Sequence, residues 1–208
     1  MTKTRGRPGG EQTREQILLA ALETMKSAGF AGATTRGIAR TGGFNQALIY
    51  YHFGSLDALL LAALDHTSGE RLERYRSAVA AATSLEELLA VATQIHTEDA
   101  AKGHTTVVAQ MIAGSVARPE LAPEMLARME PWVGLCEEAI LKTASLAGVA
   151  VPLPSRDLAY AAATFYLGVN LLTHLDPERR IEALLVRAQA LAPLLTTTTA
   201  AAAQATMR

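Results

Sequence analysis

The sequence predicts an all-α protein, and three observations favour this fold class. Half of the 208 residues are hydrophobic while only 5% are aromatic, and abundant alanine and leucine favour helices over sheets. Apolar residues recur at helical spacing along most of the chain. Residues 33–53 also have the pattern of two short helices joined by a tight turn. We therefore expect an N-terminal three-helix domain with a helix-turn-helix motif, followed by a C-terminal helical bundle.

Two segments precede this motif. Residues 1–11 are rich in glycine and basic side chains, which predicts a disordered arm. A first helix is expected from about Gln12 to Ala28, because apolar residues such as Ile17 and Met25 form a stripe that can pack behind the motif. Gly29 is the expected C-cap of this helix.

The motif is framed by capping residues and spans residues 12–54 together with the first helix. Thr34 is a suitable N-cap, and Gly43 supplies the left-handed conformation that the turn needs. Asn45 is a second N-cap, which opens a helix from Gln46 to about His52. Ile49 then points into the core, so that the polar outer face of this helix has the geometry of a recognition helix.

Three runs in this region carry a family resemblance: TREQILLAALETMKSAGF, TTRGIARTGGF and ALIYYHFGSLDALL. From Gln12 to about Leu64 the chain resembles the DNA-binding domain of the TetR/AcrR family of bacterial transcriptional regulators. Three positions depart from the usual pattern of that family. Leu48 is bulky, Leu56 replaces a lysine that commonly touches a phosphate, and Gly37 is a poor helix former.

The charge distribution indicates a polyanion partner for the N-terminal part alone. Residues 1–54 carry seven Lys or Arg against three acids, a net charge of +4, whereas the remainder carries −5. Chance clustering on a solvated face gives the same pattern. Arg36 suits a phosphate or a guanine edge, or else a surface salt bridge, and Gln46 suits adenine. Arg5 and Arg7 either enter a minor groove or contact phosphates without specificity. The predicted DNA-binding residues are Arg5, Arg7, Thr35, Arg36, Asn45, Gln46, Ala47, Tyr50, Tyr51 and His52.

Residues 55–195 are expected to form an effector-binding and dimerisation domain, followed by a flexible tail over residues 196–208. The first helix of this domain begins at Ser55 and is the natural lever between the two domains. The predicted helices are Ser55–Ala82 with a break near Ser68, Ser84–Gly103, Thr105–Ala117, Pro119–Leu146 with a kink or split at Pro131, Arg156–Leu175 and Pro177–Leu195.

The last two predicted helices carry more apolar surface than a monomer readily hides. Members of the family that the chain resembles dimerise through their last two helices as a four-helix bundle. We expect a homodimer of the same kind, with burial inside one subunit as the alternative. The predicted interface residues are Tyr160, Leu167, Leu171, Leu184, Ala188 and Leu191.

Soft methionines around aromatic rings in the same domain are typical of an adaptable apolar cavity, although ordinary core packing explains them equally well. The resemblance favours a small, mainly hydrophobic effector. The predicted effector-binding residues are His96, Gln110, Met111, Met129, Trp132, Cys136, Phe165 and Asn170.

Catalytic, metal and cofactor sites are not expected. No pair of metal-capable residues has a spacing such as HExxH or CxxC, and no glycine-rich phosphate loop is present. Cys136 is the only cysteine, which excludes an internal disulfide and fits a reducing cytoplasm. The N-terminus lacks the apolar core of a signal peptide. The uncharged run Leu158–Leu175 contains Asn170 and His174, which favours a buried helix over a membrane span.

These features predict a homodimeric, cytoplasmic transcriptional regulator, most simply a repressor that an effector releases from a palindromic operator in double-stranded DNA. One alternative is a constitutive DNA binder with a filled core and no inducer. The other is a helical small-molecule-binding protein or enzyme whose DNA contacts have been lost, which Leu48 and Leu56 support.

Overall fold

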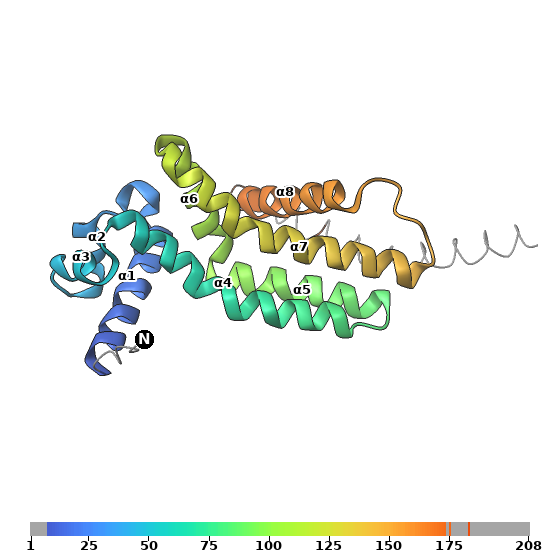
Figure 1. Ribbon diagram of the computed structural model, residues 1–208, viewed down its shortest axis with the longest axis horizontal. Helices are drawn as coiled ribbons and strands as arrows, with labels where there is room; N and C mark the ends of the chain where they lie inside the picture. Colours follow the sequence, from blue (N-terminus) through green and yellow to red (C-terminus); the bar gives the residue numbers. More distant parts are fainter. Residues whose placement is uncertain (1–7, 174, 176–182, 184–208) are drawn as a thin grey trace, which may run out of the picture. The chain divides into compact units, whose positions relative to one another are not determined.

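The computed structural model describes residues 8–173, 175 and 183, and every regular element in this part of the chain is helical (Figure 1). The predicted all-α fold class is therefore confirmed. The elements are α1 (Pro8–Gly32), α2 (Thr35–Gly42), α3 (Ala47–Phe53), α4 (Leu56–Ala81), α5 (Leu85–Lys102), α6 (His104–Ala117), the 3-10 turn η1 (Pro119–Leu121), α7 (Ala122–Ala147) and α8 (Ser155–Thr173).

Packing divides the chain into two compact units. Unit 1 contains the residues up to Arg71 together with residues 102–130, and unit 2 contains Leu72–Ala101 together with the residues from Pro131 onward. Helices α4 and α7 each begin in unit 1 and end in unit 2. This division differs from the predicted domain boundary after residue 54, because α6 packs against α1 within unit 1.

Helix α1 extends beyond both of its predicted ends. It begins at Pro8, so residues 8–11 are helical in place of the arm that their composition predicts. Proline is tolerated there because the first N–H groups of a helix have no intrahelical partner in any case. Gly29, the predicted C-cap, interrupts the helical backbone with φ of 69°, and one further turn follows. Arg5 and Arg7 lie outside the described residues.

The core of unit 1 joins one face of each of its first four helices. Ile17, Ile38, Ile49 and Leu59 are fully buried, and Met111 of α6 completes the cluster. Burying an aliphatic side chain of this size stabilises the fold by about 1.5–3 kcal/mol. The helix-turn-helix motif therefore rests on a core that α6 also shares.

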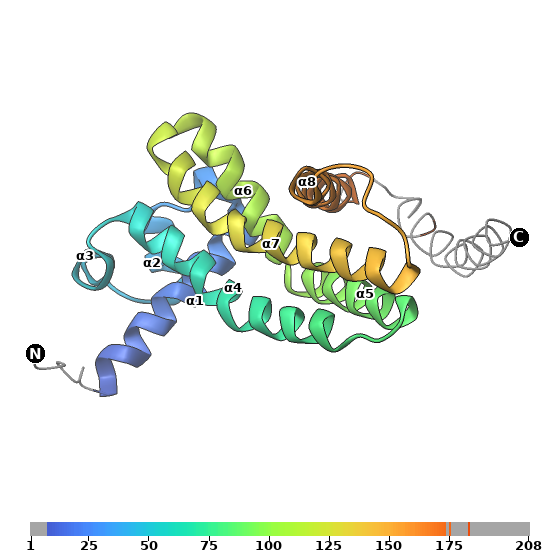
Figure 2. The ribbon, with the colours of Figure 1, turned by 45° about the vertical axis from the view of Figure 1, so that its right-hand side comes forward.

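Unit 2 is built around Tyr75 of α4. Its ring is 1% exposed and packs against Leu135 of α7, with the ring of Trp132 at 6.4 Å between centroids. The Tyr75 hydroxyl donates to Glu98 Oε2 of α5 at 2.7 Å. Burial, reinforced by this carboxylate, raises the pKa of Tyr75 to about 12. In both views α5 lies beside the later parts of α4 and α7 (Figures 1 and 2).

Polar contacts tie α8 to the same bundle. At its start, Ser155 and Arg156 donate to the Glu137 carboxylate of α7, at 2.6 and 3.1 Å. Further along, the Tyr166 hydroxyl donates to Asp99 Oδ2 of α5 at 2.7 Å, and Asp99 is almost fully buried. These contacts fix which faces of α8 remain exposed.

The predicted break in α4 is wrong, and of the kink or split predicted at Pro131 in α7 the split is wrong. Helix α4 continues through Ser68, because an exposed glycine next to it costs only about 1 kcal/mol and does not block helix propagation. Helix α7 continues through Pro131 without splitting. Pro131 and Ala127 are both exposed, so the carbonyl that loses its amide partner stays open to water. The predicted helix Pro177–Leu195 lies outside the described residues apart from residue 183.

No single helix among the described residues combines the length and apolarity needed to cross a membrane. The pair α3 and α4 meets those two criteria only when taken together across a 66° bend.

Candidate nucleic-acid interface

Short-range hydrogen bonds fix both helices of the motif. The Gly37 N–H donates to Thr34 Oγ1 at 3.0 Å, which confirms Thr34 as an N-cap, and Gly43 adopts φ of 69° after α2. The Ala47 N–H donates to Asn45 Oδ1 at 2.9 Å. Helix α3 begins at Ala47, one residue later than predicted, so Gln46 occupies the N-cap position predicted for Asn45, while the Asn45 side chain accepts from the first amide of the helix.

Helix α3 has one buried face and one exposed face. Ile49 is fully buried, and Leu48 is half-buried against the same core. On the opposite side Tyr50 is 56% exposed and Tyr51 is 82% exposed. The exposed residues of the motif's second half are Asn45, Gln46, Ala47, Tyr50 and Tyr51.

The first turn of α2 adds two polar side chains. Thr35 is half-buried and Arg36 is exposed, near the positive end of the helix dipole, which favours a nearby anion. The next residue explains one departure from the family pattern. A Cβ at Gly37 would lie 2.6 Å from the Gly32 carbonyl oxygen and 3.1 Å from Thr34 Oγ1, so the close approach of α2 to the end of α1 requires glycine.

The end of α3 is packed with rings. His52 is half-buried, with its ring 4.9 Å from that of Tyr51 and 6.4 Å from that of Phe53 between centroids. Leu56, at the start of α4, is half-buried against the unit 1 core, so this helix begins with an apolar residue rather than a cation. The guanidinium carbon of Arg14 in α1 lies 4.9 Å from the centre of the Phe53 ring.

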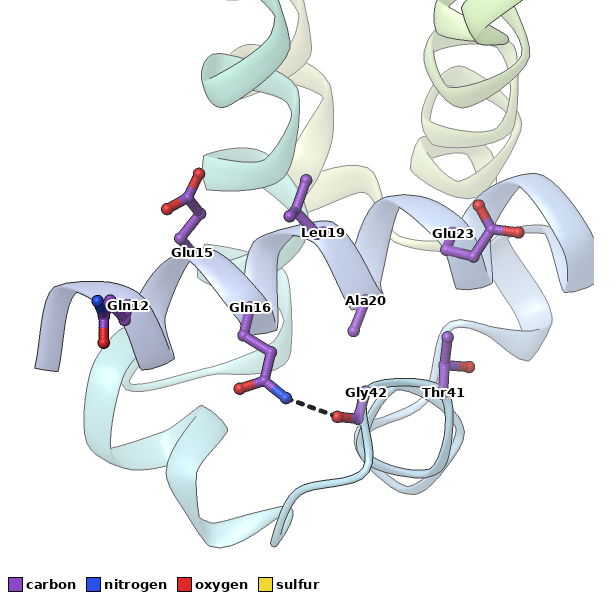
Figure 3. A pocket seen from close by; sticks show the side chains of 8 residues that line it. All are labelled: Gln12, Glu15, Gln16, Leu19, Ala20, Glu23, Thr41 and Gly42. Carbon is purple, nitrogen blue, oxygen red and sulfur yellow. Dashed lines mark hydrogen bonds between the residues drawn. The ribbon is translucent and has the colours of Figure 1, made fainter. Parts of the chain in front are cut away.

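A shallow hollow of about 430 Å³ lies between α1 and the end of α2 (Figure 3). Gln16 crosses it from α1, and its Nε2 donates to the Gly42 carbonyl at 2.8 Å. Carbonyls at the end of a helix lack intrahelical partners, so this bond stabilises the turn of the motif. Sequence reasoning missed Gln16 and Arg14, because neither contact has a signal in the local pattern.

The predicted effector-binding residues are divided between the two units. In unit 1, Met111 is fully buried in the core and Gln110 Oε1 accepts the Phe30 N–H at 2.9 Å, so packing and hydrogen bonding within that unit account for both. Phe165 in unit 2 is 63% exposed. None of the predicted residues lines the hollow in Figure 3. Met129 also belongs to unit 1, whereas His96, Trp132, Cys136, Phe165 and Asn170 belong to unit 2.

Polar groups do converge within unit 2. Asn170 is 7% exposed, and its Nδ2 donates to the Tyr166 carbonyl at 2.8 Å. The His96 ring lies edge-on to Tyr166, with 6.5 Å between centroids. Burial raises the pKa of the Cys136 thiol, which makes it a weak nucleophile. The described residues contain no cluster of three His, Cys, Asp or Glu that could hold a metal ion.

Part of the predicted dimer surface is visible on α8. Tyr160 is 43% exposed and Leu171 is 56% exposed, while Leu167 is half-buried. Phe165 and Leu172 add to the exposed apolar surface of this helix. The other predicted interface residues, Leu184, Ala188 and Leu191, lie outside the described residues.

The N-terminal part of the chain is similar in sequence to known regulatory proteins. The family model described as bacterial regulatory proteins, tetR family, matches residues 17–63. The HTH-type transcriptional repressor NicS of Pseudomonas putida is 36% identical over 56 residues, which are 27% of this chain and 26% of NicS. The match thus spans about a quarter of the length of that relative.

Solved structures resemble the chain over most of its length. The fatty acid degradation regulator FadR from Bacillus halodurans has a TM-score of 0.69 at 20% identity, covering 92% of this chain and 96% of FadR. The TetR family regulator CifR, solved with a 26 bp operator DNA, has a TM-score of 0.68 at 18% identity, covering 92% of this chain and 100% of CifR. At these identities the likeness shows a shared fold.

Proposed function

We propose that this chain, a member of the tetR family of bacterial regulatory proteins, is a transcriptional repressor. In this proposal it binds operator DNA and is released from it by a small, mainly hydrophobic effector. The observation that carries the proposal is the outward face of α3 together with the residue before it, where Tyr50 and Gln46 are exposed while Ile49 is fully buried. Such a face has no role in the core of unit 1. It suits the edges of bases in a major groove.

The dimensions and chemistry of this face support DNA binding. A helix of the length of α3 spans about 10 Å and fits a major groove about 12 Å wide. The Gln46 amide can donate to and accept from one adenine edge, and Arg36 can reach a phosphate or a guanine. Tyr50 and Tyr51 carry exposed hydroxyls that suit phosphate oxygens.

A second copy of the chain completes the proposed DNA-binding dimer. The exposed Tyr160, Phe165 and Leu171 of α8 would be covered in a homodimer. A twofold dimer places two recognition helices on half-sites about 34 Å apart, so the operator would be palindromic. A chain that sediments as a monomer at micromolar concentration contradicts this part of the proposal.

The proposed effector site lies within unit 2. His96 and Asn170 offer polar contacts there, and Trp132 and Cys136 offer an apolar, polarisable wall. Helix α4 runs from unit 1 into unit 2, which provides a continuous element through which a ligand can act. The effector shifts the equilibrium only if it binds the arrangement that releases DNA more tightly. Native mass spectrometry of the purified protein tests for a retained ligand.

Selection from a random-sequence duplex library tests the DNA-binding proposal. Wild type should enrich a palindrome, and fluorescence anisotropy should show that Gln46→Ala and Arg36→Ala weaken binding by about 1–3 kcal/mol each. Gln94→Ala is the matched control, because Gln94 is an exposed glutamine of unit 2. Failure to bind any duplex would instead favour a helical small-molecule binder without DNA contacts.

A further inference from the structure

Arg14 is a cation of unit 1 that lies close to the recognition helix. It is exposed on α1, and its guanidinium lies over the Phe53 ring at 4.9 Å from the centroid. Stacking engages the flat face of the guanidinium and leaves the in-plane N–H donors available. Those donors match the geometry of a phosphate group. The ring therefore holds a preorganised cation at a fixed place on the surface.

No carboxylate among the described residues takes up the donors of Arg14. Within the part of the chain that the structure describes, none of the ion pairs or side-chain hydrogen bonds includes Arg14. Arg118 and Arg128, in the same unit, behave differently. Arg118 pairs with Asp57, and Arg128 pairs with Asp65 at 2.8 Å. Among the described residues of unit 1, Arg118 and Arg128 are paired with carboxylates, and Arg14 is not.

The position of Arg14 relates it to the recognition helix. Phe53 is the last residue of α3, one turn beyond the exposed Tyr50. A helix in a major groove approaches the phosphate rows at its ends. The start of α4 offers no cation there, because Leu56 packs against the core and Asp57 is acidic and paired with Arg118. Arg14 is thus the arginine that lies at the C-terminal end of α3.

We propose that Arg14 contacts a DNA phosphate beside the C-terminal end of α3 and that the Phe53 ring holds it in position. This inference rests on the proposed DNA-binding function and adds α1 to the interface. The contact would be independent of base sequence, so Arg14 sets affinity and register while Gln46 sets specificity.

Salt dependence distinguishes a phosphate contact from structural support. Each neutralised phosphate contributes about 0.9 to the slope of log affinity against log salt, so Arg14→Ala in a dimer should reduce the slope by about 1.8. At 0.1 M salt the dissociation constant should rise by about 60-fold, and the difference should vanish toward 1 M. Arg14→Lys keeps the charge and should retain most of the slope.

Lys26→Ala is the matched control. Lys26 is another exposed cation of α1, twelve residues from Arg14 and therefore about 18 Å away along the helix axis. Removing it changes the net charge equally and should change the slope by less than half as much. The probe is a 30 bp duplex selected by wild type, with an unselected 30 bp duplex beside it.

The outcomes separate the two proposals. Wild type that binds neither duplex overturns the proposed function and this contact together. If wild type binds and Arg14→Ala keeps the same slope of log affinity against log salt, the contact alone is overturned. This holds whether the affinity of the variant equals that of wild type or is reduced by the same factor at all salt concentrations. An equal loss of slope in Lys26→Ala also overturns it, because net charge would then be the cause.

Discussion

Replacing Gly37 by alanine should destabilise the protein although alanine is the better helix former. Gly37 lies inside α2, and on intrinsic propensity Gly37→Ala should stabilise the helix by about 1 kcal/mol. The new Cβ would, however, lie 2.6 Å from the Gly32 carbonyl oxygen, a backbone atom that cannot rotate away. Overpacking of this kind costs about 1–3 kcal/mol. Subtracting the propensity gain of about 1 kcal/mol from this cost, we expect the free energy of unfolding to fall by about 1 kcal/mol, within a range of about 0–2 kcal/mol.

Gly69→Ala provides the opposite sign within the same unit. Gly69 is exposed inside α4, and nothing lies within 4 Å of a Cβ built there. Propensity alone then applies, so this variant should gain about 0.5–1 kcal/mol. Urea unfolding at one fixed protein concentration measures both variants against wild type. A Gly37→Ala protein as stable as Gly69→Ala would refute the packing argument.

Three further perturbations test other contacts. Thr34→Ala removes the N-cap of α2 and should cost about 1 kcal/mol in urea unfolding, whereas Thr34→Ser should be nearly neutral. Gly114→Ala places a Cβ 2.5 Å from the Phe30 ring and should lower the thermal midpoint, in contrast to the rise that helix propensity predicts. Burial is the main cause that raises the pKa of Tyr75 to about 12. The neutral phenol therefore stabilises the fold below pH 10. This stabilisation is lost as the pH rises from about 10 to 12. Wild-type urea midpoints should therefore fall more steeply between pH 9 and 11 than those of Tyr75→Phe, and parallel curves would contradict the assignment.

The N-terminal motif is the part that could be predicted from the sequence. Thr34 and Gly43 act at the ends of α2 as their residue types indicate, because capping joins atoms only a few residues apart. The burial of Ile49 and the exposure of Tyr50 follow from helical periodicity alone. The same local signals gave α5, α6 and the loop over residues 148–154.

The remaining features depend on residues that are distant in the chain. The sequence determined the helical class, the motif and the caps, since these arise from propensity and from contacts within one or two turns. Only the tertiary structure decided that Gln110 reaches Phe30, which brings α6 into unit 1, and that Arg14 stacks on Phe53. Such contacts form when packed helices bring side chains together across long stretches of chain, and no periodic pattern records which pairs will meet.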